Sequence, residues 1–429
     1  MSAAGDHFTV QEVRLHESWL GTSGSNAASD QDGFVSAKLS VANGVIAGIE
    51  PLPDNPLRPV TMPCFLDCHT HLDKGHIWPR SPNPDGSFSG ALDSVGADRK
   101  ANWTTEDVEA RMEFGLKCAY AYGTRAIRTH IDSLSPQEHI SWPVFETVRE
   151  RWKGRIELQA ACLFGIDAAR NAEWFYELAD LVARSGGIIG AVTYMVDDLD
   201  ELLDLVFRAA IDRGLELDFH ADETDDIDAR SLHAIAKAAK RNGYEGRILV
   251  GHCCSLARQP ANAVLACLDD VAEQNISVVS LPMCNMYLQD RRSDQTTPRW
   301  RGVTLVHEMK ARGINVCVAS DNTRDPFYAY GDLDMLEVYR MATRTCHFDH
   351  PVGGWPKSVL ANAASAMGLE HGATIEIGAP ADFLVFEGRT WTELLSRPES
   401  NRTLVRNGLV VPREIPSYDE LDHLMEQTN

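Results

Sequence analysis

The sequence lacks the features that mark membrane-spanning, secreted and disulfide-bonded proteins. No apolar run approaches the roughly 20 residues needed to span a bilayer. The first residues, MSAAGDHFTVQEV, have neither the basic start nor the apolar stretch of a secretory signal. The ten cysteines include no CxxC pair, and several lie in apolar runs where a reduced thiol behaves as a small core side chain. These absences predict a soluble cytoplasmic protein without a disulfide framework.

Basic residues are also scarce. The 40 Lys and Arg are outnumbered by 62 Asp and Glu, so the formal net charge is −22. A field of this sign repels polyanions, which argues against a nucleic-acid partner and against an anionic membrane surface. The HxE and PCxxC motifs of nucleic-acid deaminases are absent too. The composition therefore predicts a globular protein without a nucleic-acid or anionic-membrane partner.

The centre of the chain alternates β-branched apolar runs with helical stretches whose apolar residues recur at the helical period. Several helical stretches, such as LDELLDLVFRAAIDRG, end in Gly, as helices commonly do. The predicted strands are residues 62–71, 125–132, 155–165, 188–195, 215–223, 247–254, 276–285 and 314–322. Eight strands that alternate with helices predict an α/β fold of the (β/α)₈ barrel type. The rival is a doubly wound open sheet, but no GxGxxG or P-loop motif follows any strand.

Both ends of the chain carry short β-type segments. FTVQEVRL and SAKLSVANGVIAGIEPL lie near the start, and ATIEIGAPADFLVFEG and RTLVRNGLVVP lie near the end. Each end contains an Asn-Gly pair between apolar runs, which predicts a tight β-hairpin. The sequence therefore predicts strands at both margins of the barrel.

Histidines and one aspartate stand at the ends of four predicted strands. His69 and His71 end the first strand, and both lie on the same side of it because side chains alternate along a strand. His220 ends the fifth strand, His252 the sixth and Asp321 the eighth. In a barrel enzyme the chemistry lies at these carboxyl ends, so we expect the side chains to meet at one mouth. Neutral imidazoles and a carboxylate suit Zn²⁺ or Fe²⁺, with a position left open for water.

Each of these residues alone fits a core or surface role, and only their joint placement favours a metal site. The segments PCFLDCHTHLDK, FHADETDD, VGHCC and RGVTLVHEMKARGINVCVASDNTRDPF resemble the amidohydrolase superfamily, within it the cytosine deaminase branch and its N-isopropylammelide hydrolase relatives. With the terminal β-segments, the resemblance covers nearly the whole chain. It implies a β-sandwich built from residues 1–61 and 371–429, a barrel over residues 62–370, and a homo-oligomer.

The resemblance also assigns roles to the residues at the strand ends. It implies four ligands of one divalent metal ion, His69, His71, His220 and Asp321. A metal lowers the pKa of bound water from about 15.7 to about 7. Asp321 can take the proton of the attacking water, and Glu223 can pass a proton to the ring and then to the leaving amine. His252 can hydrogen-bond the water and the developing oxyanion.

The number of metal ions depends on the fourth predicted strand. Binuclear relatives bridge two metals with a carboxylated Lys there, whereas the segment IIGAVTYMVDD contains no Lys. We therefore expect one metal, with His252 as a catalytic residue rather than a ligand. The ligand set accepts Zn²⁺ and Fe²⁺ alike, so the choice between them stays open.

Six further residues are predicted to contact the substrate: Lys74, His130, Phe164, Tyr194, Asn322 and Phe327. Lys74 follows the HxH motif, as a Lys does in the isopropylammelide relatives, where it lies near the pocket. The alternative for Lys74 is a rim residue that pairs with Asp73. His130 ends the second strand and faces the mouth if the register is right. The aromatic side chains can wall a planar ring, although core packing explains each of them equally well.

The substrate-reading positions differ from those of cytosine deaminases. Those enzymes have a Gln at the end of the third strand, where this chain has Leu163-Phe164-Gly165. They have a second Asp after the metal-binding Asp and a Trp after the following Asp-Pro, where this chain has Asn322 and Phe327. Unmatched buried polar groups can shift selectivity by about 10⁴–10⁵. We therefore predict a metal-dependent hydrolytic deaminase of an amino-substituted nitrogen heterocycle other than plain cytosine.

Two alternatives stay open. One is release of an alkylamine, or cyclic amide hydrolysis, on a triazine-like or pyrimidine-like ring. Retention of Glu223, which the isopropylammelide relatives lack, favours the deaminase over this alternative. The other is a non-catalytic assembly protein with the amidohydrolase fold, and the complete ligand set argues against it. The sequence leaves the exact substrate, the resident metal and the subunit number open.

Overall fold

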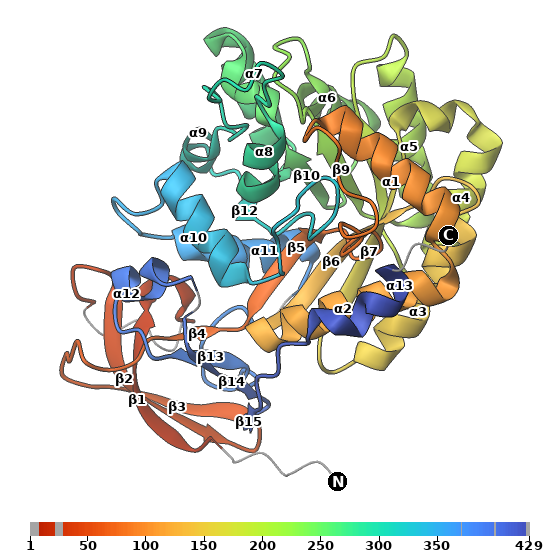
Figure 1. Cartoon of the computed structure of the whole chain (residues 1–429). Coiled ribbons are helices and arrows are strands. Elements are labelled where there is room, and N and C mark those ends of the chain that lie inside the picture. The colour runs from red at the N-terminus through yellow and green to blue at the C-terminus, as the bar shows by residue number, and fades with distance from the viewer. Residues whose placement is uncertain (1–7, 22–28, 370, 399, 426–429) are drawn as a thin grey trace.

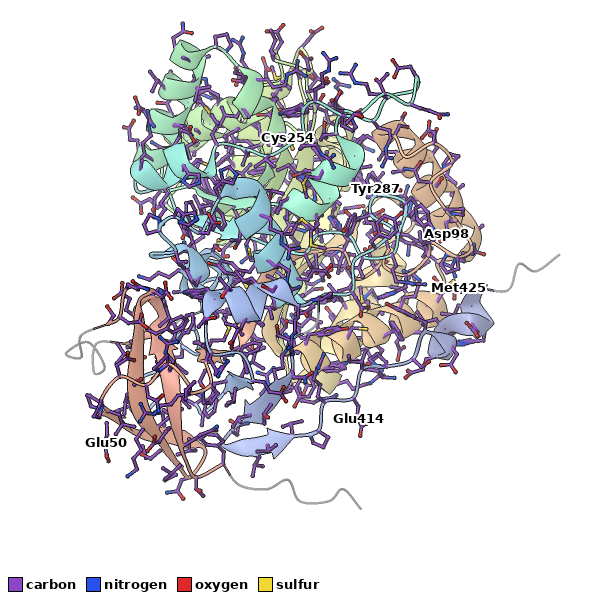
Figure 2. All side chains as sticks on the ribbon, turned by 60° about the vertical axis from the view of Figure 1, so that its left-hand side comes forward. Glu50, Asp98, Cys254, Tyr287, Glu414 and Met425 are labelled. Carbon is purple, nitrogen blue, oxygen red and sulfur yellow. The ribbon has the colours of Figure 1, made fainter. Side chains whose placement is uncertain are left out.

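The computed structural model describes residues 8–21, 29–369, 371–398 and 400–425 of the chain. Strands from the two chain ends lie together at one side, and parallel strands surrounded by helices make up the rest (Figure 1). In Figure 2, Glu50 and Glu414 lie on the side of the end strands, while Cys254 and Tyr287 lie on the opposite side. Residues 1–7 and 426–429, which the predicted terminal segments include, fall outside the described ranges.

Eight parallel strands among the described residues form two sheets in the larger part. The three-stranded sheet has the order β5 (Phe65–Thr70), β6 (Thr124–Asp132), β7 (Glu157–Leu163). The five-stranded sheet has the order β12 (Val316–Val318), β11 (Ser277–Ser280), β10 (Ile248–His252), β9 (Leu217–Ala221), β8 (Ile189–Thr193). Isolated parallel bridges join the sheets on both sides, between Thr70 and Asp321 and between Ala161 and Ile188. The mixed α/β class is therefore confirmed, and each predicted segment contains a strand.

All eight predicted strands differ from the observed ones by a few residues at their ends, and two of the predicted segments also contain part of a second element. The first is split, because Thr61–Pro63 forms a separate strand, β4, that pairs antiparallel with β13 (Phe383–Phe386) near the end of the chain. The seventh ends at Ser280 and does not reach residue 285, because Pro282 begins helix α8. Proline suits the first turn of a helix, where its missing N–H has no helical partner, and it cannot donate to a strand ladder.

Most of the helices connect the parallel strands and lie outside them (Figure 1). The longer ones are α1 (Phe88–Asn102), α2 (Thr105–Tyr122), α3 (Glu138–Trp152), α4 (Ala172–Arg184), α5 (Leu199–Arg213), α6 (Ser231–Asn242), α7 (Ala261–Glu273) and α10 (Met335–Cys346). The shorter ones are α8 (Pro282–Leu288), α9 (Val306–Ala311), α11 (Ala361–Met367), α12 (Trp391–Ser396) and α13 (Asp422–Met425). Their ends follow local sequence rules. Thr104 caps α2 by accepting the N–H of Asp107, and α5 and α6 end at Gly214 and Gly243 in the left-handed conformation.

The strands of the chain ends form two antiparallel sheets. One has the order β1 (Val10–His16), β2 (Phe34–Ala42), β3 (Val45–Pro51). The other has the order β15 (Leu409–Val411), β14 (Arg402–Arg406), β13, β4. Both predicted hairpins are confirmed, because Asn43-Gly44 joins β2 to β3 and Asn407-Gly408 joins β14 to β15. All four turn residues have positive φ, as a two-residue hairpin turn of this type requires.

The last described residues pack against the larger part rather than the end sheets. Leu421 lies in a buried cluster with Phe114 and Cys118 of α2. Nη1 of Arg80 donates to the carbonyl of Leu424 at 3.1 Å, and the same guanidinium pairs with Asp98 of α1 at 2.9 Å. Asp98 and Met425 accordingly lie on the same side of the molecule (Figure 2). The C-terminal segment therefore helps to fix α1.

The buried interior runs through both parts of the molecule. One hydrophobic cluster extends from Val13 in β1 to Val405 in β14 and includes most of the apolar residues of the parallel strands. All ten cysteines fall within the described residues, and each is buried and unpaired, as predicted. None of the helices in the described ranges combines the length and apolar character that crossing a membrane requires.

Candidate active site

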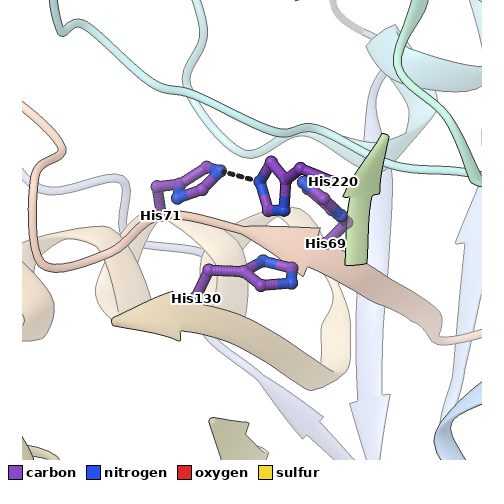
Figure 3. A group of neighbouring side chains, drawn as sticks. All are labelled: His69, His71, His130 and His220. Atoms are coloured by element: carbon purple, nitrogen blue, oxygen red, sulfur yellow. Dashed lines mark hydrogen bonds between the residues drawn. The ribbon is translucent and has the colours of Figure 1, made fainter. Parts of the chain in front are cut away.

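Four histidines come together where the parallel strands end (Figure 3). They are His69 on β5, His71 directly after β5, His130 on β6 and His220 on β9. One ring nitrogen from each lies within 4.8 Å of the others. Nε2 of His71 is 3.2 Å from Nε2 of His220, and Oδ1 of Asp321 is 3.2 Å from Nε2 of His71. The structure thus brings the predicted ligands together, and we call His69, His71, His220 and Asp321 the ligand cluster.

Several atoms of the ligand cluster have no hydrogen-bond partner. Both ring nitrogens of His69 and both carboxylate oxygens of Asp321 are buried and unpaired within the part of the chain that the structure describes. Buried polar atoms are almost always paired in proteins, because an unpaired one costs about 1–3 kcal/mol. Burial, and then the neighbouring imidazoles and Lys74, lower the pKa of His69, His71 and His220 well below the ordinary value. Neutral imidazoles beside a carboxylate fit a divalent cation.

His130 lies behind the ligand cluster and not on a cavity wall. Its Nε2 is 3.0 Å from Oδ1 of Asp218, and its Nδ1 is 3.3 Å from the carbonyl of Thr70. Its ring centre is 4.2 Å from that of His69, and none of its surface is exposed. The substrate contact expected of His130 stays a prediction, and the geometry favours a supporting role beneath His69. Asp218 was not predicted, because a lone carboxylate in mid-strand gives no sequence signal.

Glu223 and His252 face each other beside the ligand cluster. Oε1 of Glu223 lies 3.2 Å from Nδ1 of His252, and Nδ2 of Asn285 lies 3.0 Å from each of these atoms. Burial raises the pKa of Glu223, and His252 offsets part of that rise. Burial lowers the pKa of His252, but Glu223, Asp321 and Asn285 together raise it by more. The two residues predicted to move and stabilise charge are therefore in direct contact.

Two residues that hold Glu223 were not predicted from the sequence. Asn285 contacts its carboxylate, and Gln289 donates from Nε2 to its backbone carbonyl at 3.1 Å. Both belong to the segment PMCNMYLQ, whose first part we assigned to a strand. Asn285 lies within α8, and Gln289 is the first residue after it. The proline that begins α8 is the signal that could have found them.

Three residues at the strand ends have a left-handed backbone. Asp222, His252 and Asp321 have φ angles of 56°, 70° and 64°. Such conformations cost about 1–3 kcal/mol for non-glycine residues and gather at functional sites. Asp222 caps α6, since its two carboxylate oxygens accept the N–H groups of Ser231 and Leu232 at 2.7 and 3.0 Å. The acidic run DETDD thus contains one residue that shapes the turn and a second, Glu223, that faces the site.

A cavity of about 1030 Å³ opens beside the ligand cluster. His71, His220 and Asp321 form part of its wall. The predicted substrate residues that line it are Lys74, Phe164, Tyr194, Asn322 and Phe327. Its volume lies at the upper end of the range of about 300–1,000 Å³ for small-molecule sites. Helix α1 contributes Phe88 and Arg99 to the wall, so this helix limits access from solvent.

Lys74 is a buried ammonium on the cavity wall. Its Nζ pairs with Oδ1 of Asp132 at 2.7 Å, and Oδ2 of Asp132 accepts from Nη1 of Arg99 at 3.0 Å. Burial lowers the pKa of Lys74, but Asp132 and Asp73 raise it by more. Nζ lies 5.6 Å from the centre of the Phe327 ring. The ion partner of Lys74 is therefore Asp132 rather than Asp73.

Asn322 and Phe327 are fixed by one carboxylate. Oδ2 of Asp325 accepts from Nδ2 of Asn322, and Oδ1 accepts from the N–H of Phe327, each at 2.8 Å. Phe164 is almost fully buried, whereas Tyr194 lies at the rim with 41% of its surface exposed. Asn322 and Phe327 are therefore placed to face a ring close to the ligand cluster, and Tyr194 lies farther out.

Comparison with known proteins identifies relatives along nearly the full length. The family model described as "Amidohydrolase family" matches residues 164–412. A pterin deaminase of Rhizobium rhizogenes is 51% identical over 399 residues, which cover 91% of each chain. An N-isopropylammelide isopropyl amidohydrolase of Pseudomonas sp. is 22% identical over 82% of this chain and 86% of that relative. A 5-methylcytosine deaminase from Klebsiella pneumoniae, solved with 5-fluorocytosine, has the same fold, with a TM-score of 0.79, 22% identity and coverage of 94% and 98%.

Proposed function

The chain belongs to the amidohydrolase family, and from that membership we propose that it removes the amino group of a pterin. It is a hydrolase of carbon–nitrogen bonds that deaminates a nitrogen heterocycle. The observation that carries the pterin proposal is the 51% identity to a pterin deaminase over 91% of both chains. The predicted deaminase is confirmed, and the identity to a pterin deaminase argues against the non-catalytic alternative.

The cavity suits a ring system larger than a pyrimidine. A pterin is a planar bicycle with an amino group and a neighbouring ring carbonyl, and a volume of about 1030 Å³ holds it with space for a substituent. Phe327 can pack on the ring, while the Lys74 ammonium and the Asn322 amide can bond polar atoms at its edge. Asn322 and Phe327 stand at positions where the sequence differs from cytosine deaminases, which supports a substrate other than cytosine.

We also propose that the two parallel sheets are one closed (β/α)₈ barrel and that the end sheets form a sandwich. The bridges between Thr70 and Asp321 and between Ala161 and Ile188 support closure, since they join the sheets on both sides. The domain boundary is placed after Pro63 instead of residue 61, because Thr61–Pro63 pairs with β13. The barrel then ends near residue 370, and residues 371–429 complete the smaller domain apart from the segment that packs on α2.

The ligand cluster is proposed to hold one divalent cation, Zn²⁺ or Fe²⁺. The unpaired Nε2 of His69 and the unpaired Oδ1 of Asp321 support this assignment, because each can donate an electron pair to the same cation. When bound, such a cation acidifies water and readies it for attack at neutral pH. The predicted single site rests on β8, which carries no lysine at its end.

Three side chains are proposed to manage the protons. Asp321 accepts a proton from the water that attacks the carbon bearing the amino group. Glu223 gives its own proton to the adjacent ring nitrogen, takes the remaining proton of the attacking oxygen and gives it to the amine, so that the carbon–nitrogen bond breaks and ammonia leaves. The proton held by Asp321 then returns to Glu223. His252, whose Nε2 has no partner among the described residues, donates to the oxygen as it gains charge. One proton of the water ends on the ring, the other on ammonia, and its oxygen becomes the new carbonyl.

A substrate panel tests the proposal. Protein loaded with one equivalent of Zn²⁺ or Fe²⁺ is assayed for ammonia release from pterin, guanine, cytosine and N-isopropylammelide, with isopropylamine followed in parallel. We expect kcat/KM for pterin to exceed that for the other rings by at least about 10²-fold, with formation of the 2,4-dioxo product. Isopropylamine release without ammonia from pterin would favour the alkylamine alternative, and absence of pterin turnover would overturn the proposal.

The compartment and the subunit number are proposals as well. Ten buried, unpaired thiols support a reducing compartment such as the cytoplasm. The homo-oligomer rests on the family resemblance, and light scattering after size exclusion tests it. A mass equal to one chain would contradict the oligomer.

A further inference from the structure

A second group of potential metal ligands adjoins the ligand cluster. Glu223, Cys284 and Asp321 each offer one ligand atom, and these atoms lie within 4.8 Å of one another. Asp321 belongs to both groups. Its Oδ1 faces the Nε2 atoms of His69 and His71 at 3.5 and 3.2 Å, and neither carboxylate oxygen has a hydrogen-bond partner in the described chain. The second oxygen is thus available to another cation.

The other two donors of this group, Glu223 and Cys284, also lack strong hydrogen bonds at the atoms that would bind a cation. Glu223 uses Oε1 for Asn285 and His252, and its Oε2 makes no hydrogen bond to the residues described. The thiol of Cys284 lies against the Asp321 carboxylate, and its other partners are weak, since its Sγ is 3.6 Å from Oδ1 of Asn322 and 3.7 Å from the carbonyl of Phe327. Glu223, Cys284 and Asp321 therefore each have a donor atom that can bind the same cation.

The chemistry of these donors selects the kind of cation. A thiolate favours soft or borderline ions such as Zn²⁺ and Cd²⁺ over Mg²⁺ and Ca²⁺, which prefer oxygen ligands. A carboxylate bridge suits two cations held about 3.5–4 Å apart. Glu223 and Asp321 line the cavity wall, so a cation can enter by the route that the substrate uses.

We propose that Glu223, Cys284 and Asp321 form a second, inhibitory site for a soft divalent cation, bridged to the catalytic site through Asp321. On binding, the Cys284 thiol releases its proton to solvent and its sulfur forms a bond to the cation. The Glu223 carboxylate donates an electron pair to the same cation and can no longer carry a proton. The binding stands on the geometry alone, and the inhibition rests on the proposed role of Glu223. Excess Zn²⁺ or Cd²⁺ therefore stops the deaminase.

Binding is tested on the holoenzyme with Cd²⁺ as the probe. Protein that carries one equivalent of its catalytic metal is titrated with CdCl₂, while ultraviolet thiolate-to-Cd²⁺ absorbance and the metal content after gel filtration are measured. We expect one added Cd²⁺ per chain with the first metal retained. Removing even an outer partner of a metal ligand costs about 10–100-fold in affinity, so Cys284→Ser should weaken Cd²⁺ binding at least about tenfold and abolish the absorbance.

Matched variants separate this site from other thiols and from metal exchange. Cys346→Ser changes another buried cysteine that belongs to no metal-ligating group in the described chain, and it should bind Cd²⁺ as the wild type does. Cys284→Ala repeats the test if the serine variant is unstable. Loss of the first metal as Cd²⁺ enters, or equal Cd²⁺ affinity in both Cys284 variants and wild type, would overturn the second site.

Inhibition is measured apart from binding, relative to the uninhibited rate of each variant. We expect Cd²⁺ to remove at least nine-tenths of wild-type turnover and to need at least about tenfold more metal in Cys284→Ser. If Cd²⁺ binds at the second site and turnover is not lost, the inhibitory role is overturned but the binding site itself still stands. If no pterin is turned over, the proposed function fails. The absorbance and the metal content still show whether Cd²⁺ binds at the second site, because neither measurement depends on turnover.

Discussion

Asn285 donates a hydrogen bond from Nδ2 to Oε1 of Glu223 across 3.0 Å, although the residues are 62 positions apart in the sequence. The bond joins α8 to the turn that follows β9. A carboxylate that passes a proton between two partners must be held in one orientation, because a misplacement of 1 Å can cost about 10²-fold in rate. Asn285 fixes one oxygen of Glu223 and leaves the other toward the cavity. If Glu223 carries the proton as proposed, Asn285 acts as its positioning residue.

Replacing Asn285 by Ala should lower kcat by about tenfold or more, because Glu223 loses the partner that orients it. The metal content should not change, since Asn285 lies outside the ligand cluster, and KM should change much less than kcat. Gln289→Ala is the matched control, because Gln289 directly follows the same helix and its side chain bonds the backbone carbonyl of Glu223 rather than the carboxylate. Steady-state kinetics and metal analysis check both variants. A kcat equal to that of the wild type in Asn285→Ala would refute the positioning role.

The ligand assignment predicts that metal and activity are lost together. Replacing His69, His71 or His220 by Ala removes one of three imidazoles from a site with few donors to spare, so affinity should fall at least about 10²-fold. His233→Ala is the control, because His233 pairs with Asp270 at 2.8 Å between helices away from the site. Mass spectrometry of the metal and an ammonia assay are run on the same preparations. Full metal content with intact activity in a ligand variant would remove that histidine from the set.

The parts of the site that depend on local patterns could be predicted from the sequence. His69 and His71 lie two positions apart on one strand, so the period of a strand alone places both on one face. Glu223 follows His220 closely, and Asp321 follows the last parallel strand. Each of these positions needs only a strand end and the rule that chemistry gathers there.

The parts that depend on distant partners could not be predicted. Thr61–Pro63 belongs to the end sheet only because β13, more than 300 residues later in the chain, pairs with it. The partner of His130 could not be predicted either, because Asp218 on β9, which holds its Nε2 at 3.0 Å, is 88 positions away. Asn285 contacts Glu223 only because the chain forms helix α8 from Pro282 onward, where the sequence predicts a strand. Sequence periodicity contains no information on such partners.

The buried His16 makes stability depend on pH. Burial lowers the pKa of His16 to about 4, against 6.5 in the unfolded chain, and the nearby Glu17 offsets only part of the effect. Between those values the unfolded chain binds a proton that the folded protein excludes. The contribution of His16 to the free energy of unfolding therefore falls as the pH falls from about 6.5 to about 4, by up to about 1.4 kcal/mol per pH unit, and this contribution is constant above that window.

The variant His16→Gln should remove this part of the pH dependence. Its amide oxygen can accept the N–H of Ser18, as Nδ1 of His16 does at 3.1 Å, so the local turn is kept. Urea unfolding at pH 5, 6 and 7 should show a smaller loss of stability at low pH in the variant than in the wild type. His139→Gln is the control, because that side chain is 74% exposed. Identical pH dependence in wild type and His16→Gln would mean that His16 is not the group responsible.

Glu223 distinguishes a deaminase from a simple metal site, and two variants separate its role from that of Asp321. Glu223→Gln keeps the size and the hydrogen-bonding shape of the side chain but cannot carry a proton. Turnover should fall by at least about 10²-fold, the low end for general acid–base catalysis, while the metal stays bound because the ligand cluster is untouched. Asp321→Asn should also stop turnover, but it should lower the metal content, because Asp321 belongs to that cluster. Metal analysis and single-turnover kinetics on both proteins test the distinction. If Glu223→Gln kept more than about a tenth of wild-type turnover, the proton would have to travel by another group, and Glu223 would be only a buried neighbour of His252.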